Sequence, residues 1–264
     1  MYPKIKLIGE FGIASYGLMI IIGTTLAVLV LRFRKRTSKL PMNDIFYSGC
    51  FAGIGVAVGS KLLYALTMLS YAVENAALFT EKPFEYISVV FGGYVFYGGL
   101  LGGLTGAVIY CRIYKLSCFE TLDVYAPVIP LIHSFGRIGC FLAGCCYGRP
   151  SERFGVLFDA SPFAPHGIKL FPVQLLESGI NLAVFLLLFA FSVKERKCGS
   201  VLGLYLCIYA VERFLLEYLR FDEVRGLFLG VSTSQWISLI LLPIGLILLF
   251  SGKSSKIYKF LCAF

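Results

Sequence analysis

Charged residues are scarce in this 264-residue chain. They make up 15% of it, against about 25% in soluble domains. Hydrophobic residues make up 58% and the mean hydropathy is +0.82. The chain also lacks a polar stretch long enough for a soluble domain, and it lacks an obvious internal repeat. These absences exclude an ordinary soluble protein and predict a polytopic, all-α membrane protein.

Histidine is scarce too, with two residues in the chain. One of them, His133, opens an eighteen-residue stretch, residues 133–150, that also contains four glycines, two arginines and three cysteines. This concentration of polar and conformationally special residues stands out in an otherwise apolar chain. We expect the rest of the sequence to hold this stretch at a membrane surface.

The charge that is present is mostly positive, with 24 Lys and Arg against 15 Asp and Glu, a formal net charge of +9. In an apolar chain such an excess is typical of loops that obey the positive-inside rule, so we expect no nucleic-acid partner. A signal-peptide cleavage pattern is missing after the first apolar run. We therefore expect that run to remain as a membrane span.

A helix needs about twenty apolar residues to cross a bilayer. The runs that meet or approach this length predict a single transmembrane domain over residues 1–264, with about seven spans. The expected spans are Phe11–Leu31, Ile45–Ser70, Ser88–Tyr110, Leu122–Ile138, Gln174–Val193, Val201–Leu219 and Gln235–Phe250.

The basic residues of the short loops predict the orientation. Thirteen fall on one side: Arg32, Arg34, Lys35, Arg36, Lys39, Arg112, Lys115, Lys194, Arg196, Lys197, Lys253, Lys256 and Lys259. Nine fall on the other: Lys4, Lys6, Lys82, Arg137, Arg149, Arg153, Lys169, Arg220 and Arg225. We expect the first side to be cytoplasmic, with the N-terminus outside and the C-terminus inside. The longest segment between spans, at about 139–172, then faces outward, and a loop of that length is usually functional or disordered.

Ionisable residues inside spans cost about 2.5–3.5 kcal/mol each on insertion scales, which makes them functional candidates. Arg213 and Glu217 are four residues apart in the sixth expected span, so they lie on one helical face and can pair. Arg220 extends that face. A purely structural ion-pair ladder near the interface is the alternative interpretation.

His133 and Arg137 are likewise four apart, at the outer end of the fourth expected span. Two guanidinium groups from different helices can grip a phosphate, because the planar fork of donors matches phosphate oxygens. Arg137 and Arg213 are the pair that we select. Snorkelling of each arginine to the lipid headgroups is the alternative.

Tyrosine stands beside glycine in the first and third expected spans, at Tyr16-Gly17 and Tyr97-Gly98-Gly99. An aromatic belt accounts for most tyrosines of a membrane protein, but a phenol beside a small-residue kink can also donate to a ligand oxygen. Lys61 is interpreted as a snorkelling residue or the partner of a buried acid. His166 has no visible partner and is left out of the site.

Nine cysteines are present, and three of them, Cys140, Cys145 and Cys146, cluster. A second ligand pair of the kind that zinc sites usually have is missing from this spacing, so the metal signal is weak. A thiolate activated by a nearby arginine or histidine, a disulfide on the outward side, and simple packing of small residues all remain open.

The stretch resembles the signature of bacterial prolipoprotein diacylglyceryl transferases, Gly-Arg-x-Gly-Asn-Phe-x-Asn-x-Glu-x-x-Gly. The matching residues are Gly136, Arg137, Gly139, Phe141 and Gly148. Other matches follow in the family's order along nearly the whole chain. They are Tyr16-Gly17-Leu18-Met19, Gly98-Gly99-Leu100, Asp123 with Ala126-Pro127, Pro172-x-Gln174-x-x-Glu177, and Arg213 with Glu217 and Arg220.

The resemblance implies a multi-pass protein of the bacterial cytoplasmic membrane and a specific reaction. Phosphatidylglycerol donates its diacylglyceryl group to the lipobox cysteine thiol of a preprolipoprotein, and glycerol phosphate is released. It also implies that neither a metal nor an organic cofactor is needed. Arginine side chains can neutralise the charge that develops on the departing phosphate, and a base must accept the proton of the thiol.

The chain departs from the family pattern at several polar positions: Tyr97 and Phe171 replace histidines, Cys140 and Ala143 replace asparagines, and Cys145 replaces a glutamate. We therefore expect Arg137 and Arg213 to bind the phosphate and Glu217 to orient Arg213. Either His133, whose ordinary pKa of about 6.5 is near working pH, or Tyr97 handles the proton. The expected substrate-binding residues are Tyr16, Gly98, Gly99, Gly136, Gly139, Arg137 and Arg220.

Three alternatives to this transferase are kept. A divergent family member acts on another acceptor, or uses the Cys140, Cys145 and Cys146 group for thiol redox chemistry. A non-catalytic membrane protein binds lipid. A transporter is disfavoured, because the ionisable residues gather toward one side and the two halves show no repeat.

Overall fold

The computed structural model describes residues 2–8, 11–34, 40–221 and 227–251. The chain forms two compact units, which are described one at a time: Lys39–Thr121 is one, and Met1–Ser38 with Leu122–Phe264 is the other. In the described ranges, five helices are long and apolar enough to cross a membrane, or six when one bent pair counts as a span. The expected all-α, polytopic membrane fold is confirmed, while the count of seven spans, the orientation and the single domain stay predictions.

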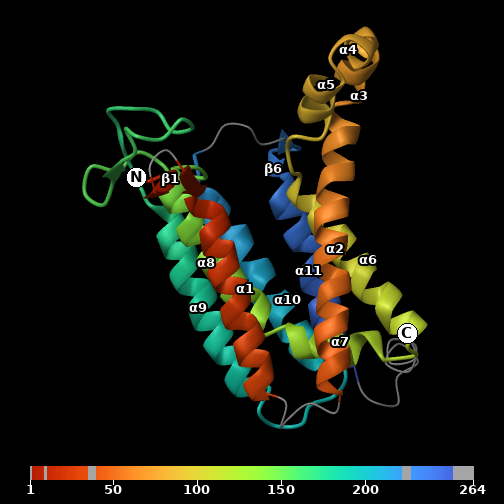
Figure 1. Ribbon diagram of the computed structural model, residues 1–264. Helices are drawn as coiled ribbons and strands as arrows, with labels where there is room; N and C mark the ends of the chain where they lie inside the picture. The colour runs from red at the N-terminus through yellow and green to blue at the C-terminus, as the bar shows by residue number, and fades with distance from the viewer. Residues whose placement is uncertain (1, 9–10, 35–39, 222–226, 252–264) are drawn as a thin grey trace. The chain divides into compact units, whose positions relative to one another are not determined.

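The larger unit contains the first long helix and the helices from α8 onward (Figure 1). Its elements are β1 (Lys4–Ile8), β2 (Phe11–Ala14), α1 (Ser15–Arg34), α8 (Val128–Ala143), β3 (Val156–Leu157), β4 (Lys169–Leu170), α9 (Val173–Phe191), α10 (Ser200–Leu216), the 3-10 helix η1 (Glu217–Leu219), β5 (Leu227–Phe228), β6 (Val231–Ser232) and α11 (Thr233–Phe250). Helix α8 packs between α1 and α9, and α10 packs against α9 and α11. The strands form three short antiparallel pairs, β1–β2, β3–β4 and β5–β6.

The smaller unit consists of α2 (Met42–Thr67), α3 (Leu69–Glu74), α4 (Ala76–Glu81), α5 (Pro83–Val90) and α6 (Phe96–Ile113). Glycines bring α2 and α6 into backbone contact. A Cβ atom added to Gly102 would lie 2.1 Å from the carbonyl oxygen of Gly55, and one added to Gly98 would lie 2.3 Å from that of Gly59. Such close approach is typical of helix pairs in membranes, where packing replaces the hydrophobic effect.

Helix α7 (Cys118–Tyr125) leads from the smaller unit into the larger one and is bent by 45° against α8. Pro127 stands at the start of α8 and lacks the N–H that would continue the helix from α7. Asp123 accepts hydrogen bonds from the backbone N–H groups of Gly199 and Leu202, at 2.7 and 2.8 Å, and so caps the N-terminus of α10. The matched residues Asp123 and Pro127 therefore shape the helix junctions around the core.

Several expected boundaries were wrong. Residues 11–14 of the first expected span form strand β2, which pairs with β1. The third expected span begins at Phe96 rather than Ser88, because α5 ends at Val90 and a non-helical segment with Gly92 and Gly93 follows. Helix α8 continues past Ile138 to Ala143. Hydropathy does not distinguish an apolar hairpin or turn from an apolar helix.

The segment that follows α8 has little regular secondary structure but is packed around its own core. Phe158, Ala164 and Leu170 form a small buried core, against which Phe141 and Tyr147 pack. The Ser161 hydroxyl donates to the carbonyl oxygen of Gly144 at 2.8 Å. The loop therefore has its own hydrophobic cluster and is fastened to the end of α8.

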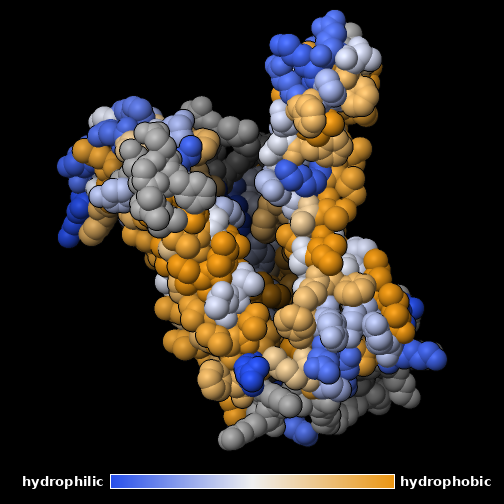
Figure 2. Space-filling model, in the orientation of Figure 1, coloured by the Kyte–Doolittle hydropathy of each residue, from blue (hydrophilic) through white to orange (hydrophobic). Residues whose placement is uncertain are grey.

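Apolar side chains cover the flanks of both units (Figure 2). On α1, Ile21, Val28 and Leu29 are exposed, and on α2 the same holds for Ile54, Leu62 and Leu66. Contiguous apolar surface of this kind fits lipid contact. Of the basic residues that set the expected orientation, Lys35, Arg36, Lys39, Arg225, Lys253, Lys256 and Lys259 lie outside the described residues.

A candidate active site on α8, α9 and α10

A buried carboxylate joins α8 to α9. Glu177 on α9 is 2% exposed, and its Oε1 lies 2.8 Å from Nη2 of Arg137 and 3.5 Å from Nε2 of His133, both on α8. Arg137 also donates from Nε to Nε2 of His133 at 3.3 Å. The expected shared face of His133 and Arg137 is therefore present, and it is completed by an acid from the neighbouring helix.

A second ion pair lies at the end of α10. Nη2 of Arg213 is 2.9 Å from Oε2 of Glu217, which begins the 3-10 helix η1. Both side chains are largely buried. Within the described part of the chain, Nη1 of Arg213 is buried and has no hydrogen-bond partner. Burying a guanidinium N–H without a hydrogen-bond partner costs free energy. This N–H therefore marks a position where it can donate a hydrogen bond to a ligand oxygen.

Polar contacts connect these two pairs. Asn181 on α9 donates from Nδ2 to Oε1 of Glu212 on α10 at 2.8 Å. The rings of His133 and Tyr209 lie 6.2 Å apart between their centroids, and Tyr209 precedes Arg213 by one helical turn. Arg213 is also within electrostatic range of Glu177. Three helices thus surround a common group of charged and polar side chains, which we call the polar core.

The backbone after α8 is held in an unusual path. Gly144 ends the helix with φ +76°, and Cys146 has φ +58°, in the left-handed region that side chains rarely adopt. The amide of Gln174 donates to the carbonyl oxygen of Cys145 at 2.7 Å. A Cβ atom on Gly148 would lie 2.7 Å from the Phe171 carbonyl oxygen and 2.9 Å from that of Leu219. Glycine is therefore required where the chain passes between these two backbones.

Arg220 follows η1 in extended conformation and forms a β-bridge with Gly148. It does not continue the helical face of Arg213 and Glu217 as expected, because the last α-helical residue is Leu216. The bridge instead brings Arg220 to the segment after α8, within electrostatic range of Cys146. The signature segment and the end of α10 are thereby fastened to each other.

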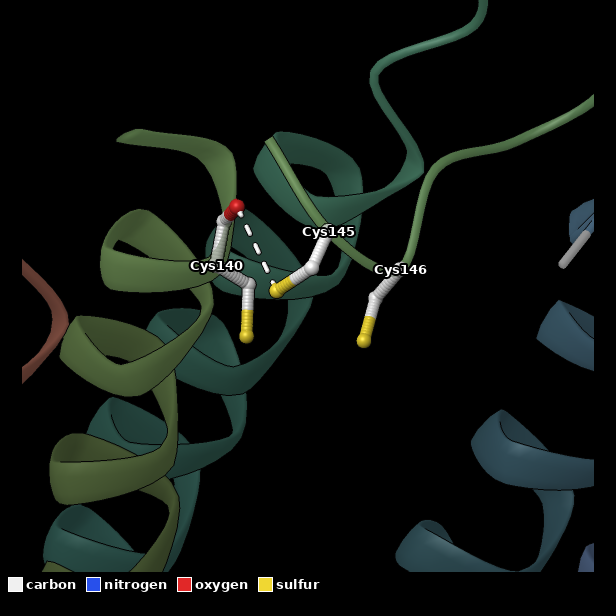
Figure 3. Close-up of side chains that lie close together, drawn as sticks. All are labelled: Cys140, Cys145 and Cys146. Atoms are coloured by element: carbon white, nitrogen blue, oxygen red, sulfur yellow. Dashed lines mark hydrogen bonds between the residues drawn. The ribbon is translucent and has the colours of Figure 1, made fainter. Parts of the chain in front are cut away.

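The three clustered cysteines converge (Figure 3). Cys140 lies on the last turn of α8, and Cys145 and Cys146 follow it; the three sulfur atoms lie within 4.8 Å of one another. All three are free thiols, and Sγ of Cys145 lies 3.8 Å from the carbonyl oxygen of Cys140. Hydrogen bonds with the Cys140 and Cys145 thiols lower the pKa of Cys146, and the guanidinium groups of Arg220 and Arg137 act in the same direction. The corresponding hydrogen bonds raise the pKa of Cys145.

The glycines of the signature and of the third expected span pack helices. A Cβ atom on Gly139 would lie 3.0 Å from the Cα atom of Tyr16 on α1, and one on Gly136 would lie 3.2 Å from Cδ1 of Ile20. Tyr16 is thereby brought beside α8, within electrostatic range of Arg137.

Tyr97, Gly98 and Gly99 lie on α6 of the smaller unit, and the polar core belongs to the larger unit. A Cβ atom on Gly99 would lie 2.6 Å from the Ser60 hydroxyl oxygen on α2. A role of these three residues in catalysis or substrate binding stays a prediction.

The structure shows contacts for two residues outside the polar core, while the snorkelling expected of Lys61 stays a prediction. Lys61 pairs with no acid among the described residues that contact it: its ammonium group donates to the carbonyl oxygen of Phe91 and lies 4.0 Å from the ring centroid of Tyr94. His166 has a partner, since its Nε2 is 2.9 Å from the carbonyl oxygen of Ser161. Both residues help to hold local structure.

Sequence reasoning missed part of the polar core. Glu177 was quoted only as part of the Pro172-x-Gln174-x-x-Glu177 match, and Asn181 and Tyr209 were not selected. The signal that was available is the presence of Glu177 and Asn181, four residues apart, inside an apolar span. A side chain that is costly in a span requires a partner on another helix.

The family model for prolipoprotein diacylglyceryl transferase matches residues 3–251. The chain belongs to this family. The match covers both units and includes the polar core, so the resemblance drawn from the separate motifs is confirmed.

Proteins named phosphatidylglycerol–prolipoprotein diacylglyceryl transferase are similar along most of their length. The one from Clostridium tetani is 37% identical over 235 residues, covering 89% of this chain and 91% of the relative. A second from Clostridium perfringens is 36% identical over 248 residues, covering 92% of each. One from Nitrosomonas europaea is 31% identical over 265 residues, covering 94% and 91%. The family thus spans distant bacteria.

Proposed function

We propose that this chain is a phosphatidylglycerol–prolipoprotein diacylglyceryl transferase of the bacterial cytoplasmic membrane. It moves the diacylglyceryl group of phosphatidylglycerol to the lipobox cysteine thiol of a preprolipoprotein. Support comes from the family match over residues 3–251, from the names of its relatives, and from the apolar helices that fit a membrane.

The observation that carries the proposal is the pair of buried arginines in the polar core. Arg137 is fixed by Glu177, and Arg213 is fixed by Glu217 while its Nη1 is left without a hydrogen-bond partner among the described residues. A guanidinium held in this way can donate to a phosphate oxygen without rearrangement. Arg137 and Arg213 are therefore assigned to the phosphate of the lipid.

The reaction exchanges one bond for another. The acceptor sulfur attacks the glyceryl carbon that carries the phosphate; the carbon–oxygen bond breaks, and its electron pair stays on the departing glycerol phosphate. The negative charge on that phosphate grows in the transition state, where the two guanidinium groups stabilise it. Glu177 and Glu217 act as positioning residues, because each holds one arginine.

The proton of the thiol goes to His133 or Tyr97. His133 lies beside Arg137, and its Nε2 accepts from Arg137 Nε, so its unprotonated form is the one that suits this contact. A neutral imidazole can take up a proton. Tyr97 is the alternative, on the smaller unit. Substrate contacts are assigned to Tyr16, Gly136, Gly139 and Arg220, and to Gly98 and Gly99.

The test uses the purified chain, phosphatidylglycerol vesicles and a lipobox peptide, whose mass is measured. We expect the peptide to gain one diacylglyceryl group, and we expect no gain on a peptide whose cysteine is serine. Arg137→Ala should abolish the gain although the protein still inserts into the membrane. Arg153→Ala, an exposed loop arginine, is the matched control that keeps full activity.

The other outcomes separate the alternative functions. Full activity of Arg137→Ala would refute the assignment of the phosphate site. A peptide without mass gain, together with an altered mass at Cys145 or Cys146, would favour thiol redox chemistry. Binding of phosphatidylglycerol without any transfer would favour a non-catalytic lipid-binding protein.

A further inference from the structure

Two of the three cysteines at the end of α8 lie at positions where this chain departs from the signature that it resembles. Cys140 and Cys145 replace an asparagine and a glutamate of the signature, so two polar groups are lost and two thiols are gained next to Cys146. The structure brings the three sulfurs within 4.8 Å of one another. The spacing in the sequence was only a weak indication of a metal site, but in the structure the three thiols form a compact cluster of soft ligands.

The spacing of the sulfurs fits a metal ion. With Zn–S bonds of about 2.3 Å, the sulfurs of a tetrahedral site lie roughly 3.8 Å apart. Each sulfur therefore needs to move by less than about 1 Å to close on an ion at the centre. A disulfide would use two of the sulfurs and would leave the third without a role.

The surrounding backbone holds the ligands in place. Cys146 keeps a left-handed φ of +58°, and the Gln174 amide fixes the carbonyl oxygen of Cys145. Cys140 is set by the last turn of α8 and is buried. Unusual backbone conformations of this type persist where neighbouring contacts over-determine them, as they do at functional sites.

We propose that Cys140, Cys145 and Cys146 bind one Zn²⁺ ion through three thiolates, with a fourth coordination position open to the thiol of the acceptor cysteine. Zinc is chosen because thiolates suit it, it is not reduced or oxidised, and it prefers four ligands, so that three cysteines leave one position free. Three thiolates would already complete the coordination of a trigonal Cu⁺ site and would leave no position for the acceptor thiol. The role of the fourth position rests on the proposed transferase function, whereas metal binding by the three cysteines does not.

The charges and protons balance. Three S–H bonds are replaced by three Zn–S bonds and three protons leave, so the site carries a single negative charge. The acceptor thiol loses one more proton, to His133 or Tyr97, as its sulfur binds, because a coordinated thiol is deprotonated. Arg220 and Arg137 lie within electrostatic range and offset the negative charge. The sulfur then attacks the glyceryl carbon, and the thioether that forms leaves the ion.

The first measurement is the metal content of the chain purified from membranes without chelator. We expect one zinc per chain, protection of the three thiols from alkylation, and loss of both in Cys145→Ser. Cys207→Ser is the matched control: its Sγ is also partly buried and lies 3.9 Å from a backbone carbonyl oxygen, that of Leu242, outside the cluster. Removing zinc from the unmutated chain with a chelator and adding it back gives the same comparison without a substitution.

The second measurement concerns the open position. In chain reconstituted with Co²⁺, the thiolate-to-metal absorption should rise by about one third when the lipobox peptide binds, as three thiolates become four. The serine peptide should leave it unchanged. Diacylglyceryl transfer should fall at least tenfold after zinc removal and recover when zinc is restored.

The outcomes keep the two proposals apart. A chain that transfers diacylglyceryl while it holds no zinc, holds copper instead, or has two of the three cysteines in a disulfide overturns the zinc site and leaves the transferase standing. A chain that holds zinc through the three cysteines but transfers nothing supports the metal site and refutes the proposed function. An absorption that does not change with peptide overturns the role of the fourth position.

Discussion

Glu177 is a buried carboxylate with two basic neighbours, Arg137 at 2.8 Å and His133 at 3.5 Å. A charge in such a place is tolerated only because it is paired, and removing one partner leaves the other charge buried without compensation. Glu177 therefore determines the position of Arg137 as much as α8 does. Its loss should disturb the proposed phosphate site, even though we assign Glu177 no contact with the phosphate.

Glu177→Gln is expected to reduce diacylglyceryl transfer at least tenfold and to lower the free energy of unfolding by about 3–5 kcal/mol, because the Arg137 guanidinium then lies buried without a counter-charge. Both quantities can be measured on the purified protein in detergent. The control is Glu85→Gln, whose exposed pair with Lys82 should contribute less than about 1 kcal/mol. Equal effects of the two substitutions would contradict the role given to Glu177.

Arg213→Lys tests whether the shape of the guanidinium is needed or its charge alone. Lysine keeps the positive charge but loses the planar fork, which contacts Glu217 and which we propose to contact a phosphate oxygen as well. One lost charge-assisted hydrogen bond corresponds to about a ten- to hundredfold fall in transfer. Steady-state kinetics with varied phosphatidylglycerol measures this, and a variant as active as the unmutated chain would show that charge alone suffices.

For contacts between single residues, the sequence predicted pairs along one helix and missed pairs between helices. The i, i+4 spacing placed Arg213 beside Glu217 and His133 beside Arg137, and both contacts are present. The partner of Arg137 is Glu177, forty residues away on α9, and no local spacing encodes that contact. The convergence of Cys145 and Cys146 on Cys140 likewise depends on a turn with two left-handed residues, which hydropathy does not reveal.

Helices α2 and α6 approach each other through facing glycines, with the backbone of one helix against the backbone of the other. In this arrangement a methyl group has no space, and neither helix can yield without breaking the contact along its length. Helix α2 also carries Gly53, which faces open space, so the effect of a methyl group depends on the face of the helix.

Gly102→Ala is expected to lower the free energy of unfolding by about 1–3 kcal/mol, because its Cβ atom would overlap the Gly55 carbonyl oxygen. Gly53→Ala is the matched substitution on α2: no atom lies within 4 Å of its added Cβ, and alanine is the better helix former by about 0.5–1 kcal/mol. Denaturant titration in detergent compares them. A Gly53→Ala protein destabilised as much as Gly102→Ala would refute the packing argument.

Hydropathy located every long helix but not where each begins. Residues 11–14 are apolar and yet form a strand, since they pair with β1, and the apolar segment 91–95 is not helical because it contains Gly92 and Gly93. Segment 144–172 gave no periodic signal, although its core of Phe158, Ala164 and Leu170 keeps it folded. The conformation of such segments depends on contacts between residues that are distant in the sequence. A local window of sequence does not contain both partners of these contacts.

For the whole molecule, the distribution of lysine and arginine predicts a cytoplasmic C-terminus. A green fluorescent protein fused after residue 264 should therefore fluoresce, because it matures in the cytoplasm, and alkaline phosphatase at the same position should be inactive. The reverse pattern would overturn the orientation and would place the segment at 139–172 inside the cell. Fusions within that segment, at the exposed Arg153, should give the opposite result.

The family could be predicted from the sequence because its motifs occur in the same order along nearly the whole chain, and the match over residues 3–251 agrees. Departures at Tyr97, Cys140 and Cys145 were visible in the sequence as well. Their consequence was not visible, because it depends on which side chains come together in space. Only the fold shows that two of these positions bring their thiols to a third.

Helix α10 has a consequence for how the protein is made. It is 17 residues long, carries Glu212 and Arg213, and is shorter than the helices of the described chain that are long and apolar enough to span a membrane by themselves. Its Glu212 is bonded to Asn181 of α9, the helix synthesised just before it. Each charge costs about 2.5–3.5 kcal/mol in lipid, so the translocon should release α9 and α10 into the bilayer together, as a hairpin with the polar contact already formed.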